Sequence, residues 1–163
     1  MDVEMSGYEV LEIAEKIERN GVKFYRRAAG LCDDPSISTL LVQLAQWESK
    51  HIEVFRQMRE RLAAEHWKLG QIEPNRIDMP DARAMAGLAV FGIQPDPTQE
   101  LTGNESKADV LRLAIEKEKD SIVYYTGLKD FVPQEIDRRT IEEVIQEEMK
   151  HVRILVQSLE QIT

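Results

Sequence analysis

Residues 37–62 read ISTLLVQLAQWESKHIEVFRQMRERL, and their apolar side chains recur every three or four positions. That spacing places these side chains along one face of an α-helix. Two residues on this face, Glu48 and His51, are polar, although the other positions of the stripe hold aliphatic, aromatic or methionine side chains. A buried carboxylate is disfavoured unless it is paired or bound to a cation. The stretch therefore predicts a core-facing helix that carries a polar site.

The same pattern returns 100 residues later in the chain. Each Glu-x-x-His pair follows a lone glutamate by 30 residues, and each lone glutamate precedes a tyrosine by seven. The matching positions are Glu18/Glu118, Tyr25/Tyr125, Glu48/Glu148 and His51/His151. Residues three apart on a helix lie on one side, so each Glu-x-x-His pair can reach a single point. Four carboxylates and two imidazoles, repeated in this way, predict a two-metal site.

Three further apolar stripes, within residues 10–31, 111–128 and 141–162, have helical spacing and predict an all-α four-helix bundle. The connector at residues 68–105 contains four of the six prolines. A connector of this length allows the chain to return along the bundle, so that the third helix starts at the same end as the second. The expected topology is a bundle with a long crossover between helices 2 and 3, related internally by a two-fold axis.

The bulk composition is that of one soluble domain over residues 1–163. A net charge of −9 argues against a nucleic-acid partner. No apolar run approaches the roughly 20 residues that cross a membrane. The acidic start lacks the features of a signal peptide, and the single cysteine, Cys32, forms no internal disulfide. We therefore expect a cytoplasmic protein.

Other acidic and imidazole side chains are not expected to bind the metal directly. Glu147 lies about 100° around the helix from the apolar stripe and is excluded. Glu15, Glu53 and Glu116 are interpreted as solvated or as neighbours of the ligands. His66 has no comparable partners in the sequence and is not expected to bind metal.

Tyr25 and Tyr125 lie two helical turns beyond the lone glutamates, on the same side of their helices. One interpretation is that they are core aromatic residues with a partner for the hydroxyl. The other is that each hydroxyl donates to a ligand carboxylate from the antiparallel helix and fixes its orientation. Both interpretations are compatible with the sequence.

The type of ligand narrows the choice of metal. Two divalent cations carry a charge of +4, which balances four carboxylates while neutral imidazoles complete the site. Carboxylate and imidazole ligands without a thiolate suit iron or manganese. We expect two iron ions, with manganese or a mixed iron–manganese pair as alternatives.

Four segments carry a resemblance to a known family: ERNGVKFY (18–25), ESKH (48–51), EKDSIVYY (118–125) and EMKH (148–151). They resemble the rubrerythrin-like branch of the ferritin-like di-iron carboxylate superfamily. The resemblance implies bridging carboxylates at Glu48 and Glu148, terminal carboxylates at Glu18 and Glu118, and one imidazole for each iron at His51 and His151.

The chain also departs from that family. Rubrerythrins place a further carboxylate one turn after the third-helix glutamate, where this chain has Ser121, and they usually carry a rubredoxin domain, for which this chain has no cysteine-rich segment. The resemblance implies a redox protein that reacts with O2 or H2O2 and takes electrons from a separate donor protein. Family habit and the apolar segment 82–91 favour a homodimer. The alternatives are ferritin-type iron oxidation and storage, or a non-catalytic bundle stabilised by metal.

Overall fold

The computed structural model describes residues 7–68 and 97–163, with side chains described for 7–65 and 99–163. Most of these residues lie in four long α-helices. The helices are α1 (Gly7–Leu31), α2 (Pro35–Lys68), α5 (Lys107–Leu128) and α6 (Glu135–Glu160). Two short 3-10 helices, η1 (Pro97–Glu100) and η2 (Lys129–Phe131), complete the described elements.

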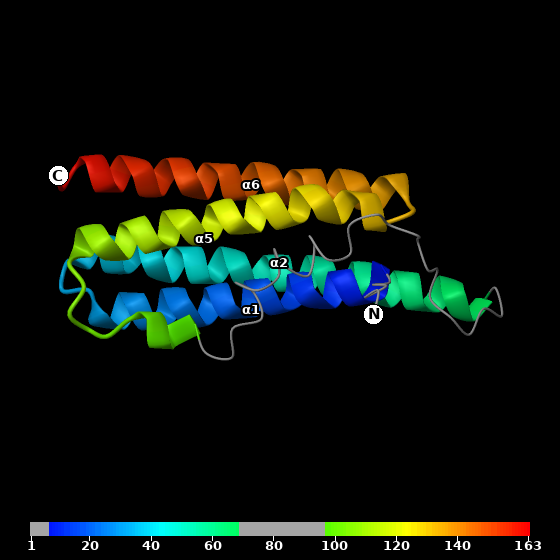
Figure 1. Cartoon of the computed structure of the whole chain (residues 1–163), viewed down its shortest axis with the longest axis horizontal. Coiled ribbons are helices and arrows are strands. Elements are labelled where there is room, and N and C mark those ends of the chain that lie inside the picture. Colours follow the sequence, from blue (N-terminus) through cyan, green and yellow to red (C-terminus); the bar gives the residue numbers. More distant parts are fainter. Residues whose placement is uncertain (1–6, 69–96) are drawn as a thin grey trace, which may run out of the picture.

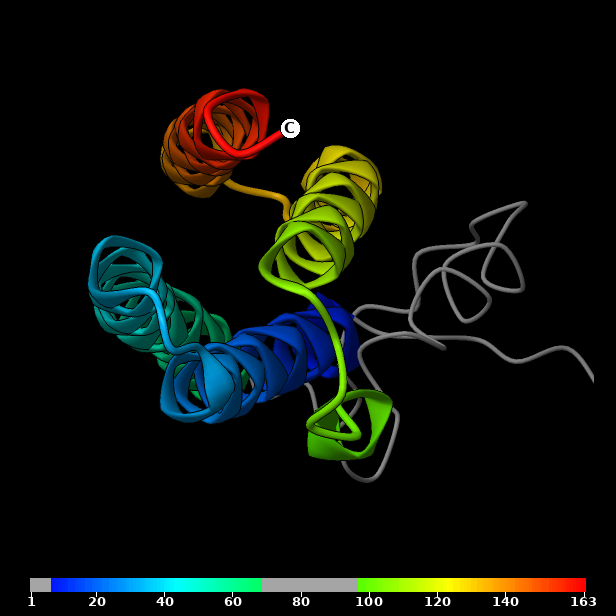
Figure 2. The same cartoon turned by 90° about the vertical axis from the view of Figure 1, so that its left-hand side faces the viewer.

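The four helices run side by side along the long axis of the molecule (Figure 1). Helix α1 lies antiparallel to α2, and α5 lies antiparallel to α6. Helix α5 begins at the end of the bundle where α2 begins, although α2 finishes at the opposite end. The end-on view in Figure 2 shows the α1–α2 pair facing the α5–α6 pair. The predicted all-α bundle with a crossover between its second and third helices is confirmed.

Side chains at two helix starts fix where α2 and α5 begin. The Asp34 carboxylate accepts hydrogen bonds from the backbone amides of Ser36 and Ile37, at 3.0 and 3.3 Å, ahead of the proline that opens α2. Ser106 and Asp109 form a capping box at the start of α5. A 3.2 Å ion pair between Lys107 and Asp34 joins the two starts at one end of the bundle.

The apolar interior is divided into two clusters, one toward each end of the bundle. One includes Leu11, Phe55, Met58, Tyr125 and Ile141. The other includes Phe24, Leu41, Leu44, Leu111 and Leu155. The polar residues predicted to form the site lie between these clusters in the sequence of every helix. Consequently the site is closed along the bundle axis by two apolar layers.

Some predictions concern residues outside those described. The apolar segment 82–91, and the homodimer prediction that rested partly on it, fall in this group. Within the described ranges 7–68 and 97–163, no helix is both long and apolar enough to cross a membrane.

Candidate metal centre

The six predicted ligands meet halfway along the bundle, although they come from all four helices. Helix α1 contributes one carboxylate, as does α5, while α2 and α6 each contribute a carboxylate and an imidazole. All six side chains are buried, with at most 4% of any residue exposed: Glu18, Glu48, His51, Glu118, Glu148 and His151. Helical periodicity explains this burial, because each of these residues occupies a core position in its apolar stripe.

The ligand atoms form two overlapping groups, each gathered within 4.8 Å. One group is Glu18, Glu48, His51 and Glu148, and the other is Glu48, Glu118, Glu148 and His151. Glu48 and Glu148 belong to both groups, which is the geometry required of carboxylates that bridge two cations. Each group also has one imidazole and one carboxylate of its own. The arrangement is therefore that of two adjacent four-ligand positions.

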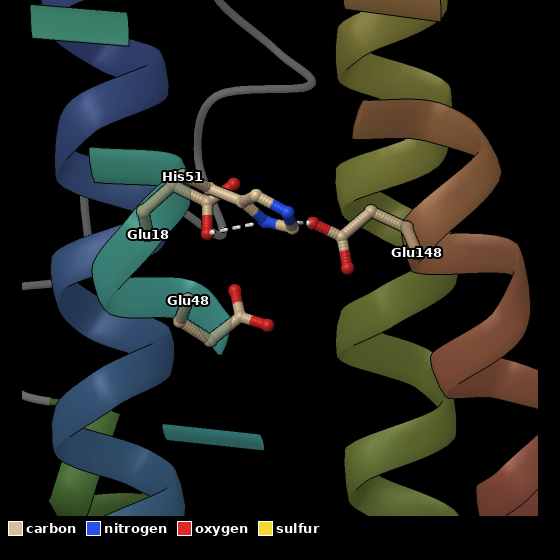
Figure 3. A group of neighbouring side chains, drawn as sticks. All are labelled: Glu18, Glu48, His51 and Glu148. Carbon is tan, nitrogen blue, oxygen red and sulfur yellow. Dashed lines mark ion pairs between the residues drawn. The ribbon is translucent and has the colours of Figure 1, made fainter. Parts of the chain in front are cut away.

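The imidazole of His51 points into the first group, as Figure 3 shows. Its Nδ1 atom lies 2.9 Å from Glu148 Oε1 and 3.7 Å from Glu18 Oε2. The short contact to Glu148 lacks hydrogen-bond geometry, so His51 Nδ1 has no hydrogen-bond partner. The opposite ring nitrogen, Nε2, faces outward to Glu147.

The imidazole of His151 occupies the second group in a matching way. Its Nδ1 atom lies 2.8 Å from Glu148 Oε2, in a hydrogen bond, and 3.5 Å from both Glu48 Oε1 and Glu118 Oε2. The two imidazole rings are 6.0 Å apart between centroids. Both histidines therefore present Nδ1 to the carboxylates.

Four buried polar atoms at the centre lack a hydrogen-bond partner within the described part of the protein. They are Glu18 Oε2, Glu48 Oε1, His51 Nδ1 and Glu148 Oε1, one from each residue of the first group. A buried polar atom left unpaired costs roughly 1–3 kcal/mol, and more when it is charged. Cations bound by these residues would satisfy such unpaired atoms.

Mutual repulsion between the carboxylates appears in their pKa values. Burial raises the pKa of Glu48 well above its usual value, and the charges of Glu148 and Glu18 raise it further. Burial and the charge of Glu148 likewise raise the pKa of Glu118. The pKa of Glu148 is instead lowered, because the effect of burial is outweighed by the close imidazoles of His151 and His51. Glu148 thus favours its charged form between two imidazoles, whereas burial and repulsion disfavour the charged forms of Glu48 and Glu118.

The nearby carboxylates raise the pKa values of both histidines. Burial lowers the pKa of His51, but contacts with Glu148 and Glu18 outweigh it and raise that pKa to about 12. For His151, Glu118 and Glu148 outweigh burial and raise the pKa to about 9. Without metal, protons therefore supply the positive charge that this cluster of carboxylates demands.

The two tyrosines link the halves of the bundle reciprocally. The Tyr25 hydroxyl donates a hydrogen bond to Glu118 Oε1, and the Tyr125 hydroxyl donates to Glu18 Oε1. Both tyrosines are also fully packed core residues, so the two interpretations of the sequence hold together. Burial is the main reason that their pKa values lie well above normal, and the nearby carboxylates add to it. Each phenol thus remains a donor that orients a buried carboxylate of the other half.

Glu147 and Trp47 are neighbours of the centre whose roles sequence reasoning missed. Glu147 is not among the clustered ligands, and its side chain is 53% exposed, but its Oε2 atom lies 3.0 Å from His51 Nε2. Trp47 stacks on His151 with ring centroids 4.9 Å apart and an interplanar angle of 8°. The signal in the sequence is the 100-residue repeat, which matches position 47 to position 147. In the structure each of these residues lies beside a histidine of the other half.

Of the two interpretations of Glu15, the solvated one is wrong. Glu15 is 0% exposed, and its carboxylate pairs with Arg59 at 2.5 Å and with Arg19 at 2.8 Å. Its charge is compensated by arginine, so it requires no metal. Glu53 and Glu116 are exposed, as expected, in ion pairs with residues of their own helices. The side chain of His66 lies outside those described.

The donor set fits a pair of transition-metal ions. Four carboxylates and two imidazoles gather without a thiolate, and four of their atoms are unpaired. Hard oxygen and intermediate nitrogen ligands of this kind suit iron and manganese. The apolar layers on either side exclude competing water. The structure thus has the composition and enclosure of a di-metal site.

Comparison with known proteins agrees with this geometry. No protein-family model matches the chain, and no curated protein sequence matches it. A solved structure does match: the 2.30 Å crystal structure of a proposed ferritin-like diiron-carboxylate protein from Thermotoga maritima. The two chains are 26% identical, and the match covers 100% of each with a TM-score of 0.74. The likeness supports the ferritin-like di-iron carboxylate superfamily and does not single out its rubrerythrin-like branch.

Proposed function

We propose that this protein is a di-iron redox protein that reacts with O2 or H2O2 and is re-reduced by a separate electron donor. The observation that carries the proposal is the pair of overlapping ligand groups, buried and sharing Glu48 and Glu148. Such a site retains its metals, because every ligand belongs to the rigid interior of the bundle. Retention suits repeated redox cycles better than transfer of iron to a store.

Two Fe2+ ions held between Glu48 and Glu148 would supply two electrons, which with two protons reduce one H2O2 to two water molecules. The chain's own residues provide the setting for that chemistry. Glu18 and Glu118 would hold one ion each, and the tyrosine hydroxyls that donate to them keep both carboxylates in place. Apolar side chains above and below restrict the approach of water and larger reductants.

Anaerobic loading with Fe2+ tests the proposal. We expect two ions per chain, a rise in near-ultraviolet absorbance on mixing with O2 or H2O2, and its loss on reduction, repeated over many cycles. A chain that binds two ions without an oxidant-dependent change would instead be a metal-stabilised bundle. A large particle that accumulates many ions per chain would indicate iron storage. Either result contradicts the proposal.

The oxidant is tested separately, under the same conditions. The resemblance to rubrerythrins favours peroxide, whereas Ser121, at the position of their additional carboxylate, favours O2. Rates of oxidation measured at equal concentrations of O2 and H2O2 decide between them, and Ser121→Glu should raise the peroxide rate relative to the O2 rate. An unchanged ratio would show that position 121 does not select the oxidant.

A further inference from the structure

The two ligand groups are related by the internal repeat, but their surroundings are not. Position 147 holds a glutamate whose carboxylate lies 3.0 Å from His51 Nε2. The matching position, 47, holds a tryptophan whose ring lies flat on His151. Within the described part of the chain, no carboxylate stands beside His151 Nε2 as Glu147 stands beside His51 Nε2.

The two ligand groups also differ in their hydrogen bonds. Of the four unpaired buried atoms, Glu18 Oε2 and His51 Nδ1 belong to the His51 group alone, and the other two belong to the shared residues Glu48 and Glu148. His151 Nδ1, by contrast, is already engaged in a 2.8 Å hydrogen bond with Glu148. A cation entering the His51 position breaks no hydrogen bond of His51 Nδ1. A cation entering the His151 position must first displace an existing contact.

We propose that the two metal positions are unequal, with the His51 position filling first, and that Glu147 is a positioning residue that tightens it. The inference rests on the proposed di-metal function and adds an order of binding to it. A carboxylate that accepts a hydrogen bond from the outer nitrogen of a metal-binding imidazole fixes the tautomer and the ring orientation. Glu147 would hold the proton on Nε2 and so leave Nδ1 directed at the metal.

Stacking by Trp47 supports His151 differently. An indole ring restricts the tilt of the imidazole and covers its face, but it accepts no hydrogen bond from Nε2. It therefore limits motion without selecting the tautomer that binds metal. Loss of a carboxylate partner typically lowers metal affinity 10–100-fold. Because Glu147 is half-exposed, we expect about tenfold, at the lower end of that range.

The test is a Zn2+ titration of the metal-free full chain, labelled with 15N at histidine and followed by nuclear magnetic resonance. The chain has three histidines, so the signals can be assigned by substitution. In the wild type we expect the His51 signals to move to the bound position over the first equivalent, and those of His151 over the second. His151 filling first, or both filling together, would overturn the inference. Failure to bind two Zn2+ would count against the di-metal site itself.

Glu147→Ala should weaken the His51 position about tenfold and the His151 position less than threefold. Measuring Zn2+ affinity in His151→Ala and His51→Ala backgrounds isolates each position. Glu143→Ala, an exposed glutamate one turn earlier on α6, is the matched control and should leave both affinities unchanged. Glu147→Gln retains an acceptor oxygen and should lose less than Glu147→Ala. Equal losses at the two positions, or equal losses for Gln and Ala, would contradict a positioning role.

Discussion

The α1–α2 half and the α5–α6 half of the bundle supply the same three ligands, but they surround them differently. Each half contributes a lone glutamate and a Glu-x-x-His pair, and each sends one tyrosine to a carboxylate of the other half. Beside the histidines, however, one half presents Glu147 and the other Trp47. The comparison shows that the shared ligands determine where metals bind, whereas the unshared neighbours determine how the two positions differ.

Removal of metal is expected to have the largest effect, because both ligand groups join one half to the other. A ligand present at about 1,000 times its dissociation constant stabilises the folded state by roughly 4 kcal/mol per site. Chelation should therefore lower the melting temperature by on the order of 10 °C or more for a chain of this size. Calorimetry of loaded and chelated protein measures the shift. Equal melting temperatures would show that no bound metal holds the halves together.

Replacing both shared carboxylates removes the side chains that belong to both ligand groups. Glu48→Leu with Glu148→Leu removes charges that are buried in each half. We expect the double variant to lose metal binding, and its metal-free form to be destabilised by about 3–5 kcal/mol, because His51 and His151 lose the buried carboxylate that pairs with them. Denaturant unfolding of the metal-free proteins checks this. A metal-free variant as stable as the wild type would show that the pairs between Glu148 and the two histidines contribute little to stability.

Replacing Tyr25 or Tyr125 should lower the free energy of unfolding by the same amount if the two halves of the bundle are equivalent around these tyrosines. Tyr25→Phe and Tyr125→Phe each leave one oxygen of a buried carboxylate without its donor. Each should cost about 1–3 kcal/mol of unfolding free energy in the metal-free protein. Tyr124→Phe, whose hydroxyl donates to the Val10 carbonyl at 2.9 Å, is a control away from the centre. Costs for Tyr25 and Tyr125 that differ by more than about 1 kcal/mol would show unequal halves.

Metal affinity should rise with pH, and the pH range over which it rises should differ between the His51 and His151 positions. In the metal-free protein the pKa of His151 is raised to about 9 and that of His51 to about 12, so both hold protons at neutral pH. Metal binds the neutral ring, so each ion displaces a proton, and affinity should increase about tenfold per pH unit up to pH 9. Above pH 9 only the His51 position should retain this slope. Competition titrations from pH 6.5 to 10 measure both slopes, and a pH-independent affinity would contradict protonated imidazoles.

The same raised pKa values stabilise the metal-free protein at low pH. A group whose folded-state pKa lies above its unfolded value contributes stability that is lost as pH rises through the folded pKa. The metal-free protein should therefore become less stable as pH rises toward 9, where His151 loses its proton. Metal-loaded protein should not show this decline.

The smallest effect concerns Gly21, whose counterpart in the second half is Ser121. A Cβ atom at Gly21 would lie 3.2 Å from Glu48 Oε2, whereas one at Gly30 would meet nothing within 4 Å. Gly30→Ala should stabilise the metal-free protein by about 0.5–1 kcal/mol through helix propensity. Gly21→Ala should gain less, because Glu48 must shift, and should also weaken metal binding. Equal gains with unchanged affinity would show that Glu48 tolerates the added methyl group.

The ligands were predictable from the sequence, but their supporting partners were not. Glu48 and His51 occupy positions in an apolar stripe, and helical periodicity alone determines which side of a helix such positions face. Glu15 lies beside the stripe on α1, and its partner Arg59 comes from another helix, so its burial depends on how closely α1 and α2 pack. Glu147 was excluded because it lies off the stripe, and its contact with His51 depends on the spacing between α2 and α6.

Iron-edge anomalous diffraction tests most directly whether two cations sit between Glu48 and Glu148. For crystals grown anaerobically with Fe2+, we predict two anomalous peaks per chain. One would be bound by His51 and Glu18, and the other by His151 and Glu118. A map without peaks at this centre, in which those glutamates and imidazoles turn toward solvent, would contradict a di-metal site.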